Sequence, residues 1–296
     1  MTSTTAHDTT AAFAAGRDFI RREARVLEQR LFATLFEDAP AAGVIAALGA
    51  YRNCDGGFGH GLEPDKLCPV SLPIDTEAAL QAMAVAGTTD RTTIDAACDH
   101  LASMSRDGAV PLATPAIESY PRAEHWSEWT YEPGVNPTAG LAGLLFALDV
   151  EHPWRDDAAA FCWQALERGL PGDAHALGEA LVFLEHVDDR DRAAAIAAGV
   201  RHHLPHVSWL RMDPRDPSYG VTPLGYAPNP ASPWRSLFSD AAISGHLDRL
   251  HADQQPDGGW ALTWEPPGQA ATLAYRGVVT LWALRVLTAY GRIEAG

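Results

Sequence analysis

Apolar residues recur three and four positions apart along most of the chain, which is the spacing of one face of an α-helix. Connections rich in glycine and proline separate these segments, and no run of alternating β-branched residues predicts a sheet. The pattern therefore predicts an all-α protein. The expected helices lie at roughly residues 9–35, 40–52, 75–87, 91–104, 137–149, 156–169, 174–187, 190–204, 235–254 and 270–291.

The connections between these helices are of two kinds. Some are short, as between antiparallel helices, whereas 53–73, 105–135 and 205–234 are long and rich in Trp, Tyr, Pro and His. Long ordered loops on a helical scaffold are where binding and catalytic residues concentrate. Because no shift in composition marks a linker, we expect residues 1–296 to form a single domain.

A glycine-bearing motif recurs along the chain, and its repetition predicts an array of helical hairpins. Two glycines permit positive φ where a helix stops, the aromatic ring that follows can wedge between helices, and the aspartate can accept from the turn's own amides. The motif is therefore expected to be structural first. Its copies are Asp55-Gly-Gly-Phe58 and Asp257-Gly-Gly-Trp260, followed by Glu63-Pro64 and Glu265-Pro266 and then by Thr76-x-x-Ala-Leu80 and Thr280-x-x-Ala-Leu284, with a weaker copy at Asp107-Gly108 and Asn136-Pro-Thr-Ala-Gly-Leu.

The stretch from Gln254 to Trp260, leading into the helix that carries Thr280, resembles the repeat of squalene and oxidosqualene cyclases and of protein prenyltransferase β-subunits. The chain is also similar to bacterial prenyltransferase-like proteins that combine GGFGHGLEPD-type, NPTAGLAG-type and DGGW segments. The resemblance covers two good repeats and one poor one. It implies an α/α toroid of five to six helical hairpins around a central cavity, and acid-assisted chemistry on a hydrophobic or isoprenoid small molecule.

The sequence departs from that family at the proton donor. Cyclases that protonate an alkene carry an Asp-x-Asp-Asp-Thr-type motif, and the nearest match here is Pro73-Ile-Asp75-Thr76-Glu77. Asp75 falls where the resemblance implies the donating aspartate, but Pro73 and Thr76 replace its acidic neighbours. A carboxylate at this position also favours the start of a helix, so both interpretations of Asp75 stay open.

Three polar residues, His60, Glu63 and Asp65, lie within six positions just after the first glycine turn. If this loop enters a cavity, burial would raise the carboxylate pKa values, and His60 could set which carboxyl keeps its proton. We therefore predict Asp65 or Glu63 as the catalytic acid, His60 as its partner and Asp75 as the alternate acid. The alternative is that the acids cap loop amides, which the repeat-mate Glu265 favours because repeated positions tend to be scaffold.

Aromatic residues are the expected binding surface. Trp126, Trp129 and Tyr131 place three rings in six residues, either as a wall for a sugar or isoprenoid or as a plug of mutually stacked rings. Arg276 could bind a carboxylate or phosphate, or pair with one of the chain's own acids. The residues expected to contact substrate are Phe58, Trp126, Trp129, Tyr131, Asn136, Tyr226, Trp260, Trp264 and Arg276.

The charge of the chain narrows the partners. With 22 basic and 38 acidic residues the formal net charge is −16, which argues against nucleic acid and against an anionic membrane surface. The N-terminus does not resemble a secretory signal, and no stretch reaches 18 uninterrupted apolar residues. We expect a cytoplasmic protein, without membrane insertion, that binds a small hydrophobic or sugar-like ligand.

A metal site is the remaining chemical option. Cys54, His60, Asp65 and Cys68 supply ligand types that zinc accepts, but their spacing matches no compact zinc finger, and no cofactor is expected unless zinc or magnesium binds there. The leading functional prediction is a terpenoid cyclase-like or prenyltransferase-like enzyme. The alternatives are a carbohydrate-active enzyme, a glycoside hydrolase or lyase, on an α/α barrel, and a non-catalytic binding domain.

Overall fold

The structure is a computed structural model that describes residues 4–127 and 130–295. Over these ranges the regular structure is helical, and β-type pairing occurs only as isolated bridges between single residue pairs. The predicted all-α class is therefore confirmed. The chain divides into two compact units: unit 1 comprises residues 1–40 and 211–296, and unit 2 comprises residues 41–210. The closed toroid and the single domain stay predictions.

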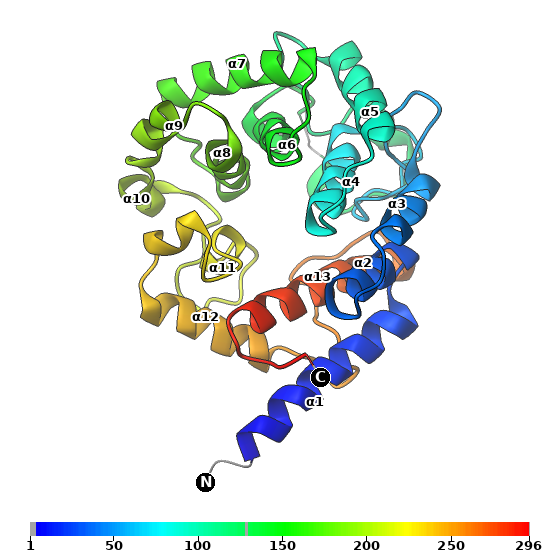
Figure 1. Cartoon of the computed structure of the whole chain (residues 1–296), viewed down its shortest axis with the longest axis vertical. Helices are drawn as coiled ribbons and strands as arrows, with labels where there is room; N and C mark the ends of the chain where they lie inside the picture. Colours follow the sequence, from blue (N-terminus) through cyan, green and yellow to red (C-terminus); the bar gives the residue numbers. More distant parts are fainter. Residues whose placement is uncertain (1–3, 128–129, 296) are drawn as a thin grey trace. The chain divides into compact units, whose positions relative to one another are not determined.

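Unit 2 is built around three helices that share one side of the unit, α4, α6 and α8, with α5 and α7 packed behind them (Figure 1). Gly143 on α6 makes the closest packing possible, because a Cβ there would lie 2.7 Å from the backbone of Val182 and Phe183 on α8. Its helices are α3 (Ala42–Leu48), α4 (Pro73–Val85), α5 (Arg91–Met104), α6 (Val135–Ala147), α7 (Pro153–Arg168), α8 (Ala174–His186), α9 (Arg190–Ala197) and α10 (Val200–His203), with short 3-10 turns η1 (Gly49–Tyr51), η2 (Pro115–Ser119), η3 (Glu124–Trp126) and η4 (Leu204–His206).

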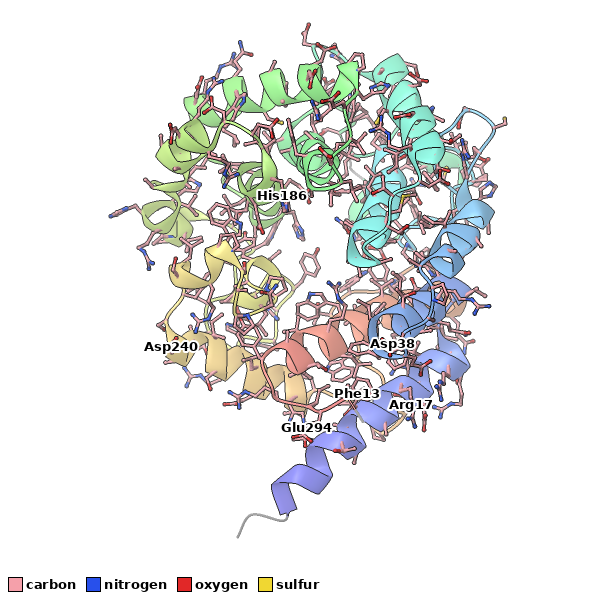
Figure 2. The ribbon with its side chains drawn as sticks, in the orientation of Figure 1. Phe13, Arg17, Asp38, His186, Asp240 and Glu294 are labelled. Atoms are coloured by element: carbon pink, nitrogen blue, oxygen red, sulfur yellow. The ribbon has the colours of Figure 1, made fainter. Side chains whose placement is uncertain are left out.

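Unit 1 is organised around its last helix, which contacts α1, α2 and α12. Figure 2 shows the side chains, among them Phe13 of α1, whose ring lies 5.8 Å from that of Phe32 and 5.2 Å from that of Phe36 on α2. The helices of this unit are α1 (Thr4–Glu23), α2 (Val26–Phe36), α11 (Pro223–Tyr226), α12 (Asp240–Ala252) and α13 (Gln269–Ala289), with the 3-10 turn η5 (Pro233–Leu237).

Helix α13 is the one described helix whose length and apolar composition would suffice to cross a membrane. Buried residues such as Gly277, Thr280 and Leu284 recur along it, and they face the packed interior of unit 1. Packing against α1, α2 and α12 of the same unit accounts for the apolar residues on its buried face.

The helix predicted over residues 9–35 is in fact two helices, because the chain is extended at Arg25 between α1 and α2. Three contacts account for the break. Arg25 Nη2 pairs with the buried carboxylate of Glu28 at 2.6 Å, and Gln29 Nε2 donates to the Ala24 carbonyl at 2.9 Å, which ends α1. A Cβ on Gly277 of α13 would lie 2.9 Å from Ala24 Cβ, so the break sits where α13 passes close by.

The repeated glycine turns have the geometry that their sequence predicts. Asp55 Oδ1 accepts a hydrogen bond from the Gly57 N–H at 3.0 Å, and Asp257 Oδ1 accepts one from the Gly259 N–H at the same distance. The first glycines of the two motifs have φ values of +90° and +92°. Each aspartate therefore closes its own turn, and each first glycine takes the left-handed backbone that it was expected to allow.

The aromatic and threonine positions of the repeat also meet. The Trp260 N–H donates to Thr280 Oγ1 at 3.1 Å, and in the weaker copy the Val110 N–H donates to Thr138 Oγ1 at 3.0 Å. The first copy departs from this rule, because Thr76 Oγ1 donates to the Leu72 carbonyl of its own helix start instead.

Candidate functional site

A buried lysine organises the loop that precedes α4 in unit 2. Lys66 is fully buried, its Nζ forms an ion pair with the Glu63 carboxylate, and it lies 3.5 Å from Asp75 Oδ2. Asp75 Oδ1 accepts a hydrogen bond from the Glu63 backbone N–H at 2.9 Å. Two predicted acids, Glu63 and Asp75, are thus brought together, but around a cation that the sequence analysis did not single out.

The pKa values in this cluster follow from burial opposed by ion pairing. Burial raises the pKa of Asp75 to about 6, although Lys66 and the Glu63 N–H both act to lower it. For Lys66, burial acts to lower the pKa, but the negative charges of Asp75 and Glu63 outweigh burial and the pKa is raised. The lysine is therefore charged at neutral pH, and it holds the two acids as partners.

Asp65 and His125 form a second contact beside this cluster. Asp65 is buried, and its Oδ2 lies 3.4 Å from Nε2 of His125. The Ala123 N–H donates to the Asp65 carbonyl at 2.7 Å, which ties the loop before α4 to the turn η3. Burial lowers the pKa of His125, so the imidazole is neutral at pH 7 and suited to share a proton with an acid rather than to pair as a cation.

His60 lies apart from the predicted acids in its hydrogen bonding. It is an exposed residue with φ +58°, and its Nε2 lies 2.9 Å from Asn53 Oδ1. Asn53 in turn donates from Nδ2 to the Pro69 carbonyl at 2.9 Å and to Ser71 Oγ at 3.0 Å. His60 thereby fastens the two ends of the loop, and its role as the acid's partner stays a prediction.

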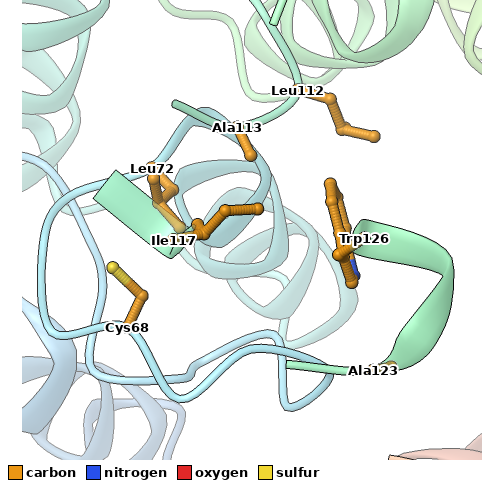
Figure 3. Close-up of a cluster of buried hydrophobic side chains, with 7 residues drawn as sticks. All are labelled: Cys68, Leu72, Leu112, Ala113, Ile117, Ala123 and Trp126. Atoms are coloured by element: carbon orange, nitrogen blue, oxygen red, sulfur yellow. The ribbon is translucent and has the colours of Figure 1, made fainter. Parts of the chain in front are cut away.

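Trp126 belongs to a compact apolar cluster beneath the same loop (Figure 3). Its side chain is buried, and Lys66 Nζ lies 5.4 Å from the centre of its ring, within reach of a cation–π contact. Tyr131 packs partly against the cluster, and its hydroxyl donates to Glu118 Oε1 at 3.0 Å. The residues of the cluster are Cys68, Leu72, Leu112, Ala113, Ile117, Ala123 and Trp126.

A pair of glutamates forms the most unusual polar contact in unit 2. Glu77 projects from α4 and Glu179 from α8, and their carboxyl groups hydrogen-bond to each other. They meet over Gly140 of α6: a Cβ on Gly140 would come within 2.5 Å of Glu77 Oε1 and would overlap the Glu179 carboxyl. The missing side chain of Gly140 thus creates the space that the two acids occupy.

The glutamate pair is poised to hold a proton. Burial and then the neighbouring Glu179 raise the pKa of Glu77 well above its ordinary value. Burial also raises the pKa of Glu179. The contact with Glu77 lowers this pKa by less than burial raises it, and the charge of Asp173 makes a smaller contribution that raises it. Two carboxyl groups in such contact hold at least one proton between them, because both cannot ionise at close range in a poorly solvated place.

The pair borders accessible space. Glu179 keeps part of its surface exposed, and Gln81, an exposed residue one turn beyond Glu77, donates from Nε2 to Glu77 Oε1 at 3.4 Å. His175 lies one turn before Glu179 on α8, and burial lowers the pKa of its imidazole. Helices α4 and α8 therefore bring together two carboxyl groups that can donate a proton and that are partly accessible. Helix α8 also carries a neutral imidazole beside them.

Sequence reasoning overlooked three of these groups. Lys66 and Glu179 were not singled out, and Glu77 entered only as part of a helix start. A signal for Glu179 was present, because it is an acid in an otherwise apolar stretch and shares a helix face with His175 four residues earlier. Nothing in the sequence indicated that Gly140 makes room for two acids, because a glycine next to alanines in a helix is ordinarily explained by close helix packing.

The other predicted binding residues lie in both units. The side chains of Phe58 and Trp260 are only 1% and 2% exposed, as expected for aromatic rings that pack between helices after a glycine turn. Tyr226 is also buried, and its ring lies near that of Phe238. Asn136 precedes Pro137 at the start of α6, through a cis peptide bond. Trp129 lies outside the described residues. The part these residues play in binding stays a prediction.

Trp264 and Arg276 belong to the last glycine turn in unit 1. The ring of Trp264 lies 4.8 Å from that of Tyr275, edge to face. Arg276 donates to both carboxylate oxygens of Asp257 at 2.8 Å and from Nε to the Trp260 carbonyl at 3.0 Å. Of the two roles weighed for Arg276, pairing with an acid of the chain is the one that these contacts fit.

The cysteines considered for a metal lie in different environments, since Cys54 is exposed and Cys68 is buried in the apolar cluster. Among residues 4–127 and 130–295, His, Cys, Asp and Glu side chains nowhere gather in threes with the arrangement that holds a metal ion.

Comparison with known proteins identifies the fold alone. Neither a protein-family profile nor a curated protein matches the chain. A crystal structure of a protein from Actinoplanes is similar, with a TM-score of 0.56, 18% sequence identity, and coverage of 94% of this chain and 99% of that one. At this level of identity the likeness describes how the helices are connected and carries no statement about chemistry.

Proposed function

We propose that this protein is an enzyme that donates a proton to a hydrophobic, isoprenoid-like small molecule, as the cyclase-like repeat implies. The observation that carries the proposal is the hydrogen-bonded carboxyl pair of Glu77 and Glu179, with pKa values raised by burial. A carboxyl group that keeps its proton at neutral pH is what acid catalysis requires.

The chemistry follows from the pair. One carboxyl O–H transfers its proton to a carbon of an alkene, whose π electrons form the new C–H bond and leave a carbocation. The step needs a resting pair in which both carboxyl groups are protonated, which the raised pKa of each favours. The second carboxyl keeps its own proton and donates a hydrogen bond to the carboxylate that remains. When a product alkene forms by loss of a proton from carbon, that carboxylate accepts the proton and the pair is restored.

The setting of the pair favours an apolar substrate. The α6 residues around Gly140 are Ala139, Leu141 and Gly143, all of them buried and without polar side chains. A sugar, by contrast, would need several hydrogen-bonding groups beside its ring. On its α6 side the pair therefore meets apolar residues, which suit a hydrocarbon better than a polyol.

The distance between the carboxyl groups weighs against glycoside hydrolysis by this pair. Glycosidases hold their two carboxyl groups about 5–9.5 Å apart, to flank a glycosidic bond or to leave room for a water molecule. Oε1 of Glu77 would lie 2.5 Å from a Cβ on Gly140 and Oε2 of Glu179 would overlap the same Cβ, so the two carboxyl groups are closer together than that range. A purely structural pair remains the competing explanation, and activity measurements separate the two.

The test is turnover in deuterated water. The full chain would be incubated with a panel of acyclic C10–C20 isoprenoid alkenes and alcohols, and products would be analysed by gas chromatography and mass spectrometry. The proposal expects a product that carries deuterium at carbon, and expects Glu77→Gln and Glu179→Gln to abolish it. Glu185→Gln, on the same helix α8, is the matched control and should retain turnover. Deuterium incorporation that persisted in both Gln variants would refute the assignment.

A further inference from the structure

One tryptophan of unit 2 exposes its ring beside the helix that carries Glu179. Trp209 follows the turn η4, and at 60% exposure it is the most exposed large apolar side chain in the described part of the chain. Its backbone is left-handed, with φ +58°, a conformation that bulky residues rarely adopt. Neither feature favours folding, and backbone outliers of this kind cluster at ligand-binding and active sites.

The position of Trp209 is determined by the residue just before it. The Ser208 N–H donates to the Gly172 carbonyl at 2.8 Å, and Ser208 Oγ donates to the same carbonyl at 3.0 Å. The Ala174 N–H in turn donates to the Ser208 carbonyl at 3.0 Å. These bonds hold the loop against the first residues of α8, so the indole is kept at the start of the helix that carries Glu179.

The ring of Trp209 lies next to His175, with 6.3 Å between the ring centroids. His175 and Glu179 are four residues apart on α8, so their side chains leave the same side of the helix with Cβ atoms about 5–6 Å apart. Both are partly exposed, as is Gly178, which adds no side chain between them. The other residues in the first two turns of α8 are buried, namely Ala174, Ala176, Leu177, Ala180 and Leu181.

We infer that Trp209 is a specificity-determining residue of the proposed proton-transfer site: the reacting alkene lies at Glu179, and the apolar chain next to it extends over Gly178 to the indole. The inference rests on the function proposed for the glutamate pair. Four residues of α-helix span about 6 Å, which is comparable to one extended isoprenoid unit. A substrate with at least one such unit beside its reacting alkene covers the indole, whereas a five-carbon substrate does not.

A ligand that cannot react separates binding from turnover. Tetrahydrogeraniol, a saturated C10 alcohol, has no alkene to protonate, and isothermal calorimetry measures its binding to the full chain. Trp209→Asn removes the ring and suits a left-handed backbone. It should weaken binding at least tenfold, which corresponds to the loss of about 60 Å² of apolar contact. Trp209→Phe should lose less, and Val26→Ala, at an exposed apolar residue of unit 1, should leave the affinity unchanged.

Turnover gives the second measurement. Trp209→Asn should lower kcat/KM for deuterium incorporation into geraniol at least tenfold, and it should leave that for the five-carbon alcohol prenol unchanged. If Trp209 only packs against His175, the variant would have a lower melting temperature and an unchanged affinity for tetrahydrogeraniol, which would overturn the inference. An unchanged kcat/KM for geraniol, or no binding of tetrahydrogeraniol to the wild type, would also overturn it. Binding that requires Trp209 without turnover of any alkene would support the apolar site and refute only the function proposed for the glutamates.

Discussion

The carboxyl groups of Glu77 and Glu179 hydrogen-bond to each other although about a hundred positions separate them in sequence, because Gly140 leaves room for both above α6. Two acids in contact are stable together only while they keep a proton between them. The pair therefore links the proton content of unit 2 to its packing, and this link can be measured whether or not a substrate is known.

Glu179→Gln should flatten the dependence of stability on pH. Because the folded pKa of each glutamate is raised, the folded state binds more protons than the unfolded state, and the stabilisation is present below the unfolded pKa and lost as pH rises through the folded one. Each unit of raised pKa corresponds to about 1.4 kcal/mol. Urea unfolding at pH 5.0, 6.5 and 8.0 should show a smaller fall in unfolding free energy for the variant than for the wild type.

Asp75 provides an internal reference for this experiment. Its pKa is raised from 3.8 to about 6, so its stabilisation is also lost as pH rises, between about pH 4 and pH 6, in both proteins. Since Asp75 is present in both proteins, the difference between them reports on the glutamate pair, from about pH 4.5 upward. Glu167→Gln, at an exposed ion pair of α7, is the control. Parallel pH profiles for wild type and Glu179→Gln would contradict the shared proton.

Gly140→Ala should disrupt the glutamate pair, because it adds a methyl group in the space that the two carboxyl groups occupy. A Cβ there overlaps the Glu179 carboxyl, and such overpacking typically destabilises by about 1–3 kcal/mol. Gly49→Ala is the matched control, since no atom lies within 4 Å of its Cβ position, and it should change the unfolding free energy by less than about 0.5 kcal/mol. Thermal and urea unfolding measure the stability of both variants.

A double-mutant cycle gives this prediction its specificity. If the clash is with Glu179, adding Gly140→Ala to Glu179→Ala should destabilise much less than adding it to the wild type. Additive effects would instead mean that the alanine disturbs the packing of α6 in general, and the pair would not be the reason for the glycine.

Lys66→Met should be strongly destabilising. It leaves Glu63 and Asp75 buried without their cation, a situation that typically costs about 3–5 kcal/mol. Adding Asp75→Asn should recover part of the loss, because the amide oxygen can still accept from the Glu63 N–H and one buried charge is gone. Arg91→Met, at an exposed pair with Asp95, should cost no more than about 1 kcal/mol. A similar small loss for Lys66→Met would show that the cluster is hydrated.

The features that could be predicted from the sequence are those determined within a few residues. Helix periodicity, the aspartate that closes its own turn and the positive φ of the first glycine all depend on local geometry, and they agree with the structure. The contact of Trp260 with Thr280 was not predicted, although both residues belong to the repeat that the sequence revealed. The prediction of one helix was wrong at Arg25, where the ion pair with Glu28 and the close approach of Gly277 on α13 accompany the break.

The candidate site could be predicted only in part, for a physical reason. Glu63 and Asp75 were both predicted as candidate acids. In the structure they are ion-pair partners of the buried Lys66. Whether a lysine is buried depends on the whole path of the loop, which the sequence pattern does not determine. The role of Glu179 depends on its contact with Glu77, which lies on α4. No local sequence pattern indicates that α4 and α8 meet at these two residues. Long-range contacts between single polar residues leave no periodic trace.

Two glycines of unit 1 with the same φ distinguish backbone strain from close packing. Gly258 and Gly268 both have φ +92°, but a Cβ on Gly258 would overlap the Ala15 carbonyl oxygen of α1, whereas nothing lies within 4 Å of a Cβ on Gly268. Alanine at either position adds a strain of about 1–2 kcal/mol. Gly258→Ala should lose a further 1–3 kcal/mol, roughly, because α1 must move away from the turn.

Urea unfolding of Gly258→Ala and Gly268→Ala, at one pH and temperature, measures this difference directly. Arg22 Nη2 donates to the Asp257 carbonyl at 3.2 Å and Gln254 Nε2 donates to the Ala12 carbonyl at 2.8 Å, so a displaced α1 would also lose these bonds. Hydrogen exchange should therefore accelerate along α1 in Gly258→Ala and not in Gly268→Ala. Equal stability and equal exchange in the two variants would mean that the glycine of the repeat serves only the turn and not the seating of the helix behind it.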